Sequence, residues 1–393
     1  MKALKSLLAA ALAFAFVAVA SAQTTIHITG STAFRKAAHQ AIGNILNTGY
    51  TVGYSGTDLT KASQAVFSGT TKTGNYSVVI KTSWSGSAGG VQAVSQQSPV
   101  ITVATWLQTG LTGSGLTGPY DAPAAAEVAF SDAYQASTAF TGTGFTTLHD
   151  TVVGVVPFVW TKGSSNDATV QASLANVTNM TPLIARLILS AGSPLSILTG
   201  TSSDSGVYVY PLGRDEDSGT RIDAFAEPGF GVFGSPIQYQ PTIAGGVITS
   251  ITAWPANTVN GISFPVGHSG YSSGGTLATA LNTPVDSAAR DTFGDKIALI
   301  AYFGVNDAAS VNGGSNNLTY NGVAYSATAV AEGKYTFWSY EHLMYAPTFS
   351  GTAKTVADQI GTQISTVDGT ASGVLLSSMN VSRTVEGGVI IHN

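Results

Sequence analysis

Three short turns share a composition that suits anion binding. Each combines glycine with serine or threonine between an apolar segment and a helical pattern: Gly30-Ser31-Thr32-Ala33, Gly86-Ser87-Ala88-Gly89-Gly90 and Asp217-Ser218-Gly219-Thr220. The first turn of a helix has unpaired N–H groups and partial positive charge, and small residues let an anion approach them. Each turn taken alone is more simply an ordinary turn or helix cap, so the prediction depends on their repetition.

Arg214 lies four residues before Ser218 and strengthens the third turn. A strand is expected to end at Leu212, and Pro228 limits the helix that follows. A guanidinium at this place can donate two parallel hydrogen bonds to a tetrahedral oxyanion beside the helix amides. A surface ion pair with one of the three acidic residues that follow Arg214 explains it equally well.

A catalytic alternative rests on Gly270-Tyr271-Ser272-Ser273-Gly274, which has the G-x-S-x-G spacing of serine hydrolases. That motif requires a strand before the serine, and Pro265 and Gly267 occupy this segment. The histidines are scattered without the spacing of metal ligands. We therefore expect no enzyme, no metal and no cofactor, and a hydrolase that uses Ser272 remains the less favoured alternative.

The elements that must position these turns alternate between strands and helices. Apolar segments predict strands, and apolar positions repeated every three or four residues predict helices. We expect strands at 26–29, 76–82, 128–131, 152–160, 207–212 and 297–303, and helices at 34–46, 183–189 and 353–364. Thr181-Pro182 has the pattern of a cap and first residue for the second helix. In the first helix, residues 35, 36, 39, 40 and 44 should form the polar face.

Two stretches rich in glycine, serine, threonine and asparagine, 109–123 and 307–317, are predicted to be surface loops. The first lengthens the segment between Ser87 and Asp132. We interpret it as an inert insertion, with a partner surface or a lid as the alternatives.

The first 22 residues have the pattern of an export signal. Lys2 and Lys5 precede an apolar run from Leu7 to Ala20, and Ala20-Ser21-Ala22 offers a small-x-small cleavage site. We expect a periplasmic or secreted product. Because the chain contains no cysteine, we expect neither a lipid anchor nor disulfides.

The composition of the remaining chain is that of a globular protein with two domains. About 370 residues exceed one ordinary core, and the full sequence, with 44% hydrophobic and 9% charged residues, is unlike a disordered chain. Removing the two signal lysines takes the formal net charge from −5 to about −7. Such a chain has no global attraction for nucleic acid or anionic lipid, so an anion site must depend on local donors.

The order of the motifs resembles the periplasmic phosphate-binding proteins of ABC transporters. The segments 30–33, 86–91, 129–133 and 214–220 are similar to that family's G-x-T-F, G-S-x-G-G, S-D-A and R-x-D-G-S-G-T segments. Segments 274–281 and 334–340 are similar to its later helix start and return strand. The resemblance thus covers nearly all of the chain after residue 22, and Arg214 with Ser218-Gly219-Thr220 is its most specific part.

The resemblance implies an α/β, two-lobed type II periplasmic-binding-protein fold with the ligand in a hinge cleft. Lobe one would comprise 23–150 and 343–393, and lobe two 151–342. The implied phosphate ligands are Thr32, the amide of Ala33, Ser87 and Asp132 from lobe one, and Arg214, Ser218, Gly219 and Thr220 from lobe two. Phosphate retains a proton that sulfate lacks, so Asp132 would accept a hydrogen bond from phosphate and repel sulfate. From the residues alone, Asp132 is more simply a strand-end cap.

Departures from the family pattern concern the same turns. Ala33 stands where the family has phenylalanine, which a backbone donor tolerates, and Glu216 and Asp217 make the third turn more acidic. The implied function is capture of inorganic phosphate by a monomer that delivers it to an ABC-transporter permease in the inner membrane. Sensing or storage fits the sequence as well. A Gly/Thr-rich surface or adhesion protein is the alternative from another class, which the alternating strands and helices disfavour.

Overall fold

The structure is a computed structural model that describes residues 23–393 apart from 98–99, 103–104 and 260–261. The predicted export signal, residues 1–22, lies outside the described residues. Among the described helices, none is both long enough and apolar enough to cross a membrane.

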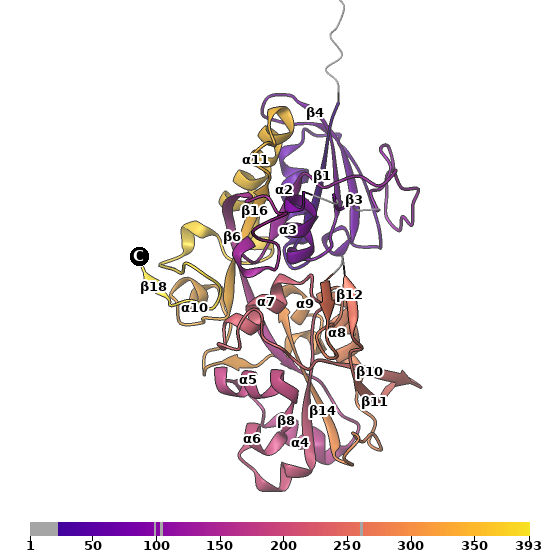
Figure 1. The fold of residues 1–393 in the computed structure, drawn as a ribbon, viewed down its shortest axis with the longest axis vertical. Helices are drawn as coiled ribbons and strands as arrows, with labels where there is room; N and C mark the ends of the chain where they lie inside the picture. Colours follow the sequence, from indigo (N-terminus) through magenta and orange to yellow (C-terminus); the bar gives the residue numbers. More distant parts are fainter. Residues whose placement is uncertain (1–22, 98–99, 103–104, 260–261) are drawn as a thin grey trace, which may run out of the picture.

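A mixed sheet of ten strands runs through the whole molecule (Figure 1). Its order is β2 (Thr51–Tyr54), β3 (Gln64–Thr70), β4 (Ser77–Ser83), β1 (Thr24–Gly30), β5 (Val128–Ser131), β16 (Trp338–Tyr345), β6 (His149–Lys162), β14 (Lys296–Gly304), β9 (Val207–Leu212) and β8 (Ser193–Pro194). β1 is parallel to β4 and β5, and β14 is parallel to β9, whereas β16 and β6 are antiparallel to their neighbours. The predicted α/β class is confirmed.

Two lobes share this sheet through its crossing strands. β6 pairs with β16 from His149 to Pro157 and with β14 from Phe158 to Lys162, so it continues from one lobe into the other. Figure 1 shows β1, β3 and β4 above this junction and β8 and β14 below it; we call the part with β1 to β5 lobe one and the part with β8, β9 and β14 lobe two. The predicted boundaries at 150/151 and 342/343 fall within β6 and β16, and the division of the chain at these residues stays a prediction.

Helices pack on both lobes, and shorter strand pairs complete the fold. Lobe one carries α2 (Arg35–Ile45), α3 (Ser87–Ser95) and α11 (Gly351–Thr366); lobe two carries α4 (Ala168–Ala175), α5 (Pro182–Ala191), α6 (Leu195–Thr199), α7 (Gly219–Ala226), α8 (Gly274–Asn282), α9 (Val305–Ala308) and α10 (Ala327–Ala331). The short pairs are β10 (Tyr239–Ala244) with β11 (Val247–Ala253), β12 (Asn257–Val259) with β13 (Ile262–Phe264), β7 (Asn179–Met180) with β15 (Thr319–Tyr320), and β17 (Val381–Ser382) with β18 (Ile391–His392).

The predicted helix patterns correspond to buried faces. Val356, Ile360 and Ile364 of α11 are fully buried, as their four-residue repeat predicts. At the start of α5 the Thr181 hydroxyl accepts a hydrogen bond from the Ile184 amide at 3.3 Å, and Pro182 is the first helical residue. The predicted cap is therefore confirmed.

The predicted polar face of α2 is partly wrong, because Arg35 and His39 are buried. His39 donates through Nδ1 to the Leu59 carbonyl at 2.7 Å and accepts at Nε2 from Trp84 Nε1 at 3.0 Å. Burial lowers the pKa of His39 to about 4. Helical spacing identifies the face of α2 that meets its own sheet, but segment 59–61 and lobe two cover part of the other face.

The two predicted loops differ from one another. In segment 109–123, Leu111 and Leu116 pack against Val66 and Val79 of the lobe-one sheet, so this segment covers a sheet face. Segment 307–317 begins inside α9, which corrects the prediction that it is a loop throughout.

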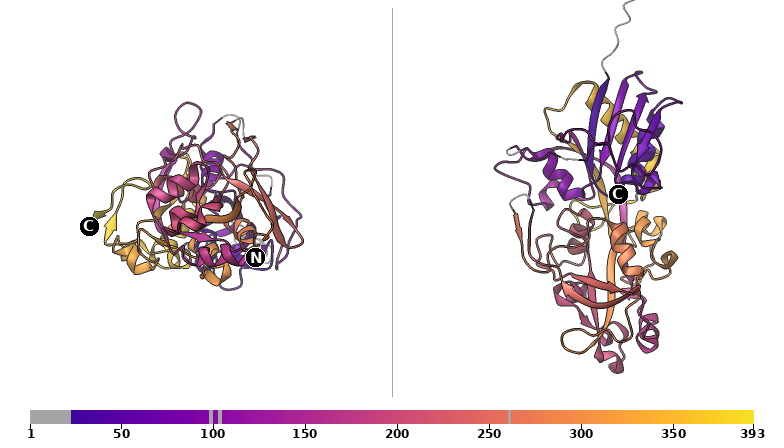
Figure 2. Two further views of the ribbon diagram at one scale, coloured as in Figure 1. Left: turned by 90° about the horizontal axis from the view of Figure 1, so that it is seen from below. Right: turned by 90° about the vertical axis from the view of Figure 1, so that its right-hand side faces the viewer.

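The C-terminal segment after α11 contacts both lobes. Arg383 pairs with Glu227 at the end of α7, with Nη1 3.1 Å from Oε2. Glu386 accepts hydrogen bonds from the amide of Tyr134 and the hydroxyl of Ser137, which follow β5 in lobe one. The right-hand view of Figure 2 shows the C-terminus at the height of the lobe junction. This segment therefore adds a second connection between the lobes beside the crossing strands.

Candidate functional site

The lobe-one part of the site lies where parallel strands end. β1, β4 and β5 are parallel neighbours, so their carboxyl ends reach the same edge of the sheet. Thr32, Ser87 and Asp132 follow these three ends within a few residues. In open α/β sheets this edge is where ligands bind, and here it faces lobe two.

The lobe-two part is the start of α7, which follows β9. Ser218 is the N-cap residue, and its hydroxyl accepts a hydrogen bond from the Arg221 amide at 3.2 Å. The amides of Gly219 and Thr220 in the same turn make no hydrogen bond with any described residue. They are therefore available as donors at the positive end of the helix.

Asp132 joins the two parts. Its carboxylate accepts hydrogen bonds from the Ser87 hydroxyl of lobe one and from the Thr220 hydroxyl of lobe two, the latter at 3.2 Å. Burial raises the pKa of Asp132, and the hydrogen bond from Ser87 and the charge of Arg214 oppose that rise. Gly219 permits the contact, since a Cβ there would lie 1.7 Å from Asp132 Oδ1.

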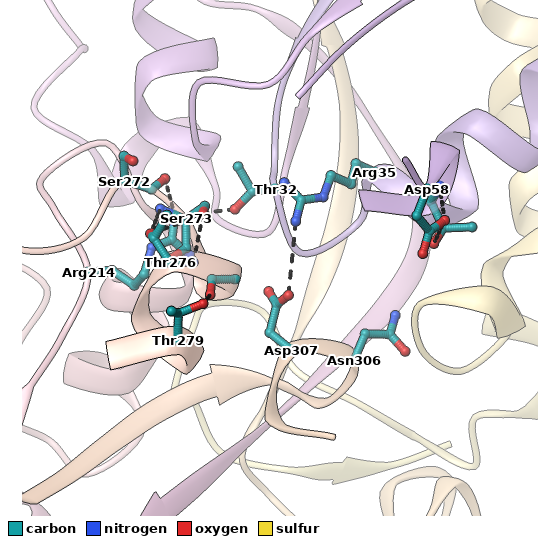
Figure 3. Close-up of polar contacts among 12 residues, drawn as sticks. Thr32, Arg35, Asp58, Arg214, Ser272, Ser273, Thr276, Thr279, Asn306 and Asp307 are labelled. Atoms are coloured by element: carbon teal, nitrogen blue, oxygen red, sulfur yellow. Dashed lines mark hydrogen bonds and ion pairs between the residues drawn. The ribbon is translucent and has the colours of Figure 1, made fainter. Parts of the chain in front are cut away.

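Arg214 makes the second polar contact across the lobes (Figure 3). Its Nη2 donates to the Thr32 hydroxyl at 3.2 Å and to the Ser272 carbonyl at 3.0 Å, and its Nε donates to the Tyr271 carbonyl at 2.9 Å. The residue is 2% exposed, and it forms no ion pair with a described residue. The alternative of a surface ion pair is therefore wrong, and the guanidinium faces the lobe junction.

The second of the three turns is used differently from the prediction. The amides of Ala88 and Gly89 donate to the Asp217 carbonyl of lobe two at 2.8 and 3.4 Å. Gly86 has a φ of +96°, and a Cβ on it would lie 2.4 Å from that same carbonyl oxygen. The amides of this turn thus bind the other lobe, while the Ser87 side chain faces Asp132.

Six of the eight predicted site residues therefore contact another of them, in two groups: Thr32 with Arg214, and Asp132 with Ser87, Thr220 and the backbone of Gly219. Ser218 is buried beside them, but its hydroxyl is used as the helix cap. Ala33 lies next to Thr32, against Gly304 of lobe two. The assignment of all eight to a ligand stays a prediction.

Sequence reasoning missed the residues that hold Arg214 in place. Tyr302 accepts from the Arg214 amide at 3.1 Å through its hydroxyl oxygen, and Gln238 donates to the Arg214 carbonyl at 2.9 Å. Both come from distant parts of the chain, and no local pattern marks them. Gly213, between the strand and Arg214, is the one local indication that another side chain packs closely here. A Cβ on it would lie 1.6 Å from Gln238 Oε1.

The G-x-S-x-G segment has a structural explanation. Gly270 packs against the backbone of Arg214, with a hypothetical Cβ at 2.3 Å from its carbonyl carbon. Ser273 caps α8 in a reciprocal pair with Thr276. In the described part of the chain no hydrogen bond joins the Ser272 hydroxyl to a histidine, and its carbonyl holds Arg214. These contacts give Gly270, Ser273 and the Ser272 carbonyl structural roles.

Of the three acidic residues after Arg214, Glu216 has hydrogen-bond partners of its own. Glu216 accepts from Asn257 at 2.7 Å and from Ser269 at 2.9 Å. Burial raises the pKa of Asp215 to about 7 and that of Asp217 to about 6. Part of the acidity that the sequence suggested is thus removed by protonation near neutral pH.

Within the described residues, no group of three or more His, Cys, Asp or Glu side chains is arranged to hold a metal ion. The polar groups gathered at the junction are instead one guanidinium, one carboxylate, several hydroxyls and free helix amides. Such a set suits an oxyanion that retains a proton.

Comparisons with known proteins gave matches among solved structures. No protein-family model matches the sequence, and no curated protein matches it. One similar structure is a putative phosphate ABC transporter substrate-binding protein with bound phosphate from Clostridium perfringens, at 13% identity and a TM-score of 0.45, covering 88% of this chain and 98% of that one.

Two further similar structures come from other bacteria. One is an ABC-type phosphate transport receptor from Vibrio cholerae, at 11% identity and a TM-score of 0.43, with 86% and 93% of the two chains covered. The other is PstS from Borrelia burgdorferi, at 15% identity and a TM-score of 0.38, with 90% and 99% covered. At this level of similarity, the function has to be argued from the site residues themselves.

Proposed function

We propose that this protein captures inorganic phosphate between its two lobes and delivers it to an ABC-type permease outside the cytoplasm. The observation that carries the proposal is that two buried, oppositely charged side chains, Arg214 and Asp132, each contact a hydroxyl of the other lobe. A cation, a carboxylate and hydroxyls from both lobes together match an anion that also has a proton to donate.

The arrangement of hydrogen-bond donors and one acceptor explains why phosphate fits better than sulfate. Arg214 and the free amides of Gly219 and Thr220 would donate to the phosphate oxygens, and Asp132 would accept the phosphate proton. Fully ionised sulfate offers Asp132 no proton, and a buried acceptor that faces another acceptor costs at least about 1–3 kcal/mol. The predicted roles of Thr32, the Ala33 amide, Ser87 and Ser218 complete the donor set.

Isothermal titration calorimetry of the secreted chain tests the proposal. We expect phosphate to bind near pH 7.5 and millimolar sulfate to leave that binding unchanged. Binding of sulfate as tightly as phosphate would contradict the proposed ligand, and absence of heat with phosphate would contradict the function.

A further inference from the structure

A cleft of about 360 Å³ lies at the lobe junction. It is beside the contacts that Asp132 and Arg214 each make with the other lobe. The loop after β1, the start of α2 and residues 60–61 form its lobe-one wall, and residues 306, 307, 309 and 310 form its lobe-two wall. Its volume lies within the range of small-molecule sites. Because each wall belongs to a different lobe, the shape of the cleft depends on how the two lobes are placed. The contacts of Asp132 and of Arg214 across the junction depend on the same placement.

The cleft is rich in positive charge for this chain. Three of its ten lining residues are Arg35, Lys36 and Lys61, although the whole sequence has only 16 lysines and arginines in 393 residues. Asp307 is the acidic lining residue, and its Oδ1 lies 4.0 Å from Arg35 Nη2. The ammonium groups of Lys36 and Lys61 make no ion pair or hydrogen bond with a described residue, and Asp58 near them lies outside the lining. The lining thus has a surplus of positive charge.

Thr32 connects the cleft to Arg214. Its side chain lines the cleft, and its hydroxyl accepts the hydrogen bond from Arg214 Nη2. Figure 3 shows Arg214 on one side of Thr32 and Arg35 on the other, with the Arg35 guanidinium directed toward Asp307. Two buried guanidinium groups from different lobes therefore flank one hydroxyl, and each repels the other. An anionic ligand that reaches from one to the other would offset this repulsion.

We propose that the cleft is a second anion subsite, through which the protein binds phosphorylated compounds that carry a further acidic group next to the phosphoryl group. The proposal rests on the proposed function, because the phosphoryl group would occupy the Arg214 site. The second group would lie against Arg35, Lys36 and Lys61. Inorganic pyrophosphate is the smallest compound of this class.

Orthophosphate alone does not account for the cleft. Thr32 and Ala33 border the cleft, but the other residues assigned to orthophosphate lie around Asp132 and Arg214 outside the cleft lining and are buried. The cleft, in contrast, is open to solvent at Lys61, which is exposed. A substituent on phosphate would project into this opening, past Thr32, without separating the buried contacts.

Calorimetric titration of the parent chain and of a Lys36→Ala/Lys61→Ala variant with orthophosphate and with pyrophosphate tests the subsite. We expect pyrophosphate to bind the parent, and the double variant to bind it about tenfold more weakly, since two partly exposed charge contacts are lost. Orthophosphate affinity should change by less than about threefold, since neither lysine contacts the buried cluster. Methyl phosphate, whose substituent is uncharged, should respond to the variant as orthophosphate does.

A Lys72→Ala/Lys334→Ala variant is the matched control, because it removes two exposed lysines away from the cleft. It should bind pyrophosphate like the parent. Orthophosphate binding without pyrophosphate binding would overturn the second subsite and leave the proposed function standing, as would equal weakening of both anions in the cleft variant. Absence of binding by either anion would overturn the proposed function together with the subsite.

Discussion

Two neighbouring regions of the lobe junction each contain a buried arginine and a buried aspartate, yet they are built differently. Around Asp132 and Arg214, hydroxyls of both lobes contact the charged groups directly, and Gly219 lets the backbone approach the carboxylate. Around Asp307 and Arg35, the ion pair is 4.0 Å long and borders an open cleft. In the proposed function, the first region would fix the geometry of phosphate, and the second would tolerate variation in what is attached to the phosphate.

The physical reason for this difference is solvent. Charges that are removed from water interact strongly with their partners, and leaving one unpaired is costly. At the cleft, the charges of Lys36 and Lys61 are only partly buried or exposed, so they are screened and each contributes little. We therefore expect substitutions in the Asp132–Arg214 region to have large effects on phosphate binding and equivalent substitutions at the cleft to have small ones.

The largest expected effect is that of Arg214→Ala. Arg214 and the bound phosphate would form a buried, hydrogen-bonded charge pair, and removal of one partner of such a pair costs about 2–5 kcal/mol. Phosphate affinity should therefore fall by a factor between about thirty and several thousand. Calorimetry measures this loss, with Lys72→Ala as the control that removes an exposed cation. An affinity within threefold of the parent would show that Arg214 is not a phosphate ligand.

Asp132→Asn should act on selectivity. The amide can turn its NH₂ group toward either anion, so the preference for phosphate over sulfate should fall by about 1–3 kcal/mol, while phosphate affinity changes less. Asp307→Asn at the cleft should leave the preference unchanged. Competition titrations near pH 7.5 measure both variants, and equal selectivity in parent and Asp132→Asn would remove the discriminating role of Asp132.

Gly219→Ala and Gly275→Ala compare the space in the two regions. A Cβ on Gly219 would lie 1.7 Å from Asp132 Oδ1, whereas the nearest heavy atom to a Cβ on Gly275 is Arg35 Nη2 at 3.9 Å. Overpacking of this kind costs about 1–3 kcal/mol, so Gly219→Ala should weaken phosphate binding about tenfold and Gly275→Ala should not. Similar affinities in the two variants would mean that Gly219 and Asp132 do not approach one another as described.

The last expected effect is on the pH dependence of stability rather than on phosphate binding, and it comes from Asp215 behind Arg214. Burial raises its pKa to about 7, so the folded state binds the proton more tightly than the unfolded state. The free energy of unfolding should therefore fall as pH rises from about 4 to about 7 and level off above that range. Urea unfolding without phosphate should show a smaller fall for Asp215→Asn. An identical fall in both proteins would contradict the raised pKa.

Local patterns predicted the elements well where one side of an element meets one core. The strands 128–131 and 207–212 were predicted at the residues where they occur, and the Thr181 cap was predicted from two adjacent residues. The same reasoning failed for Arg35 and His39, because a helix at a lobe junction is covered on more than one face. It also failed for segment 307–317. The helix α9 begins directly after the apolar strand β14 and includes residues 307 and 308, which were predicted to be loop.

For the candidate site, the sequence by itself determined which turns carry small residues and hydroxyls, and that Arg214 precedes a helix start. Only the tertiary structure decided that Asp132 meets Thr220 across the junction, that the amides of Ala88 and Gly89 bind Asp217, and that Tyr302 and Gln238 hold Arg214. A turn or cap depends on residues close in sequence and leaves a local pattern. A contact between lobes, or between distant segments of one lobe, depends on how two separate surfaces meet, and residues 24 or more positions apart leave no local pattern of that meeting.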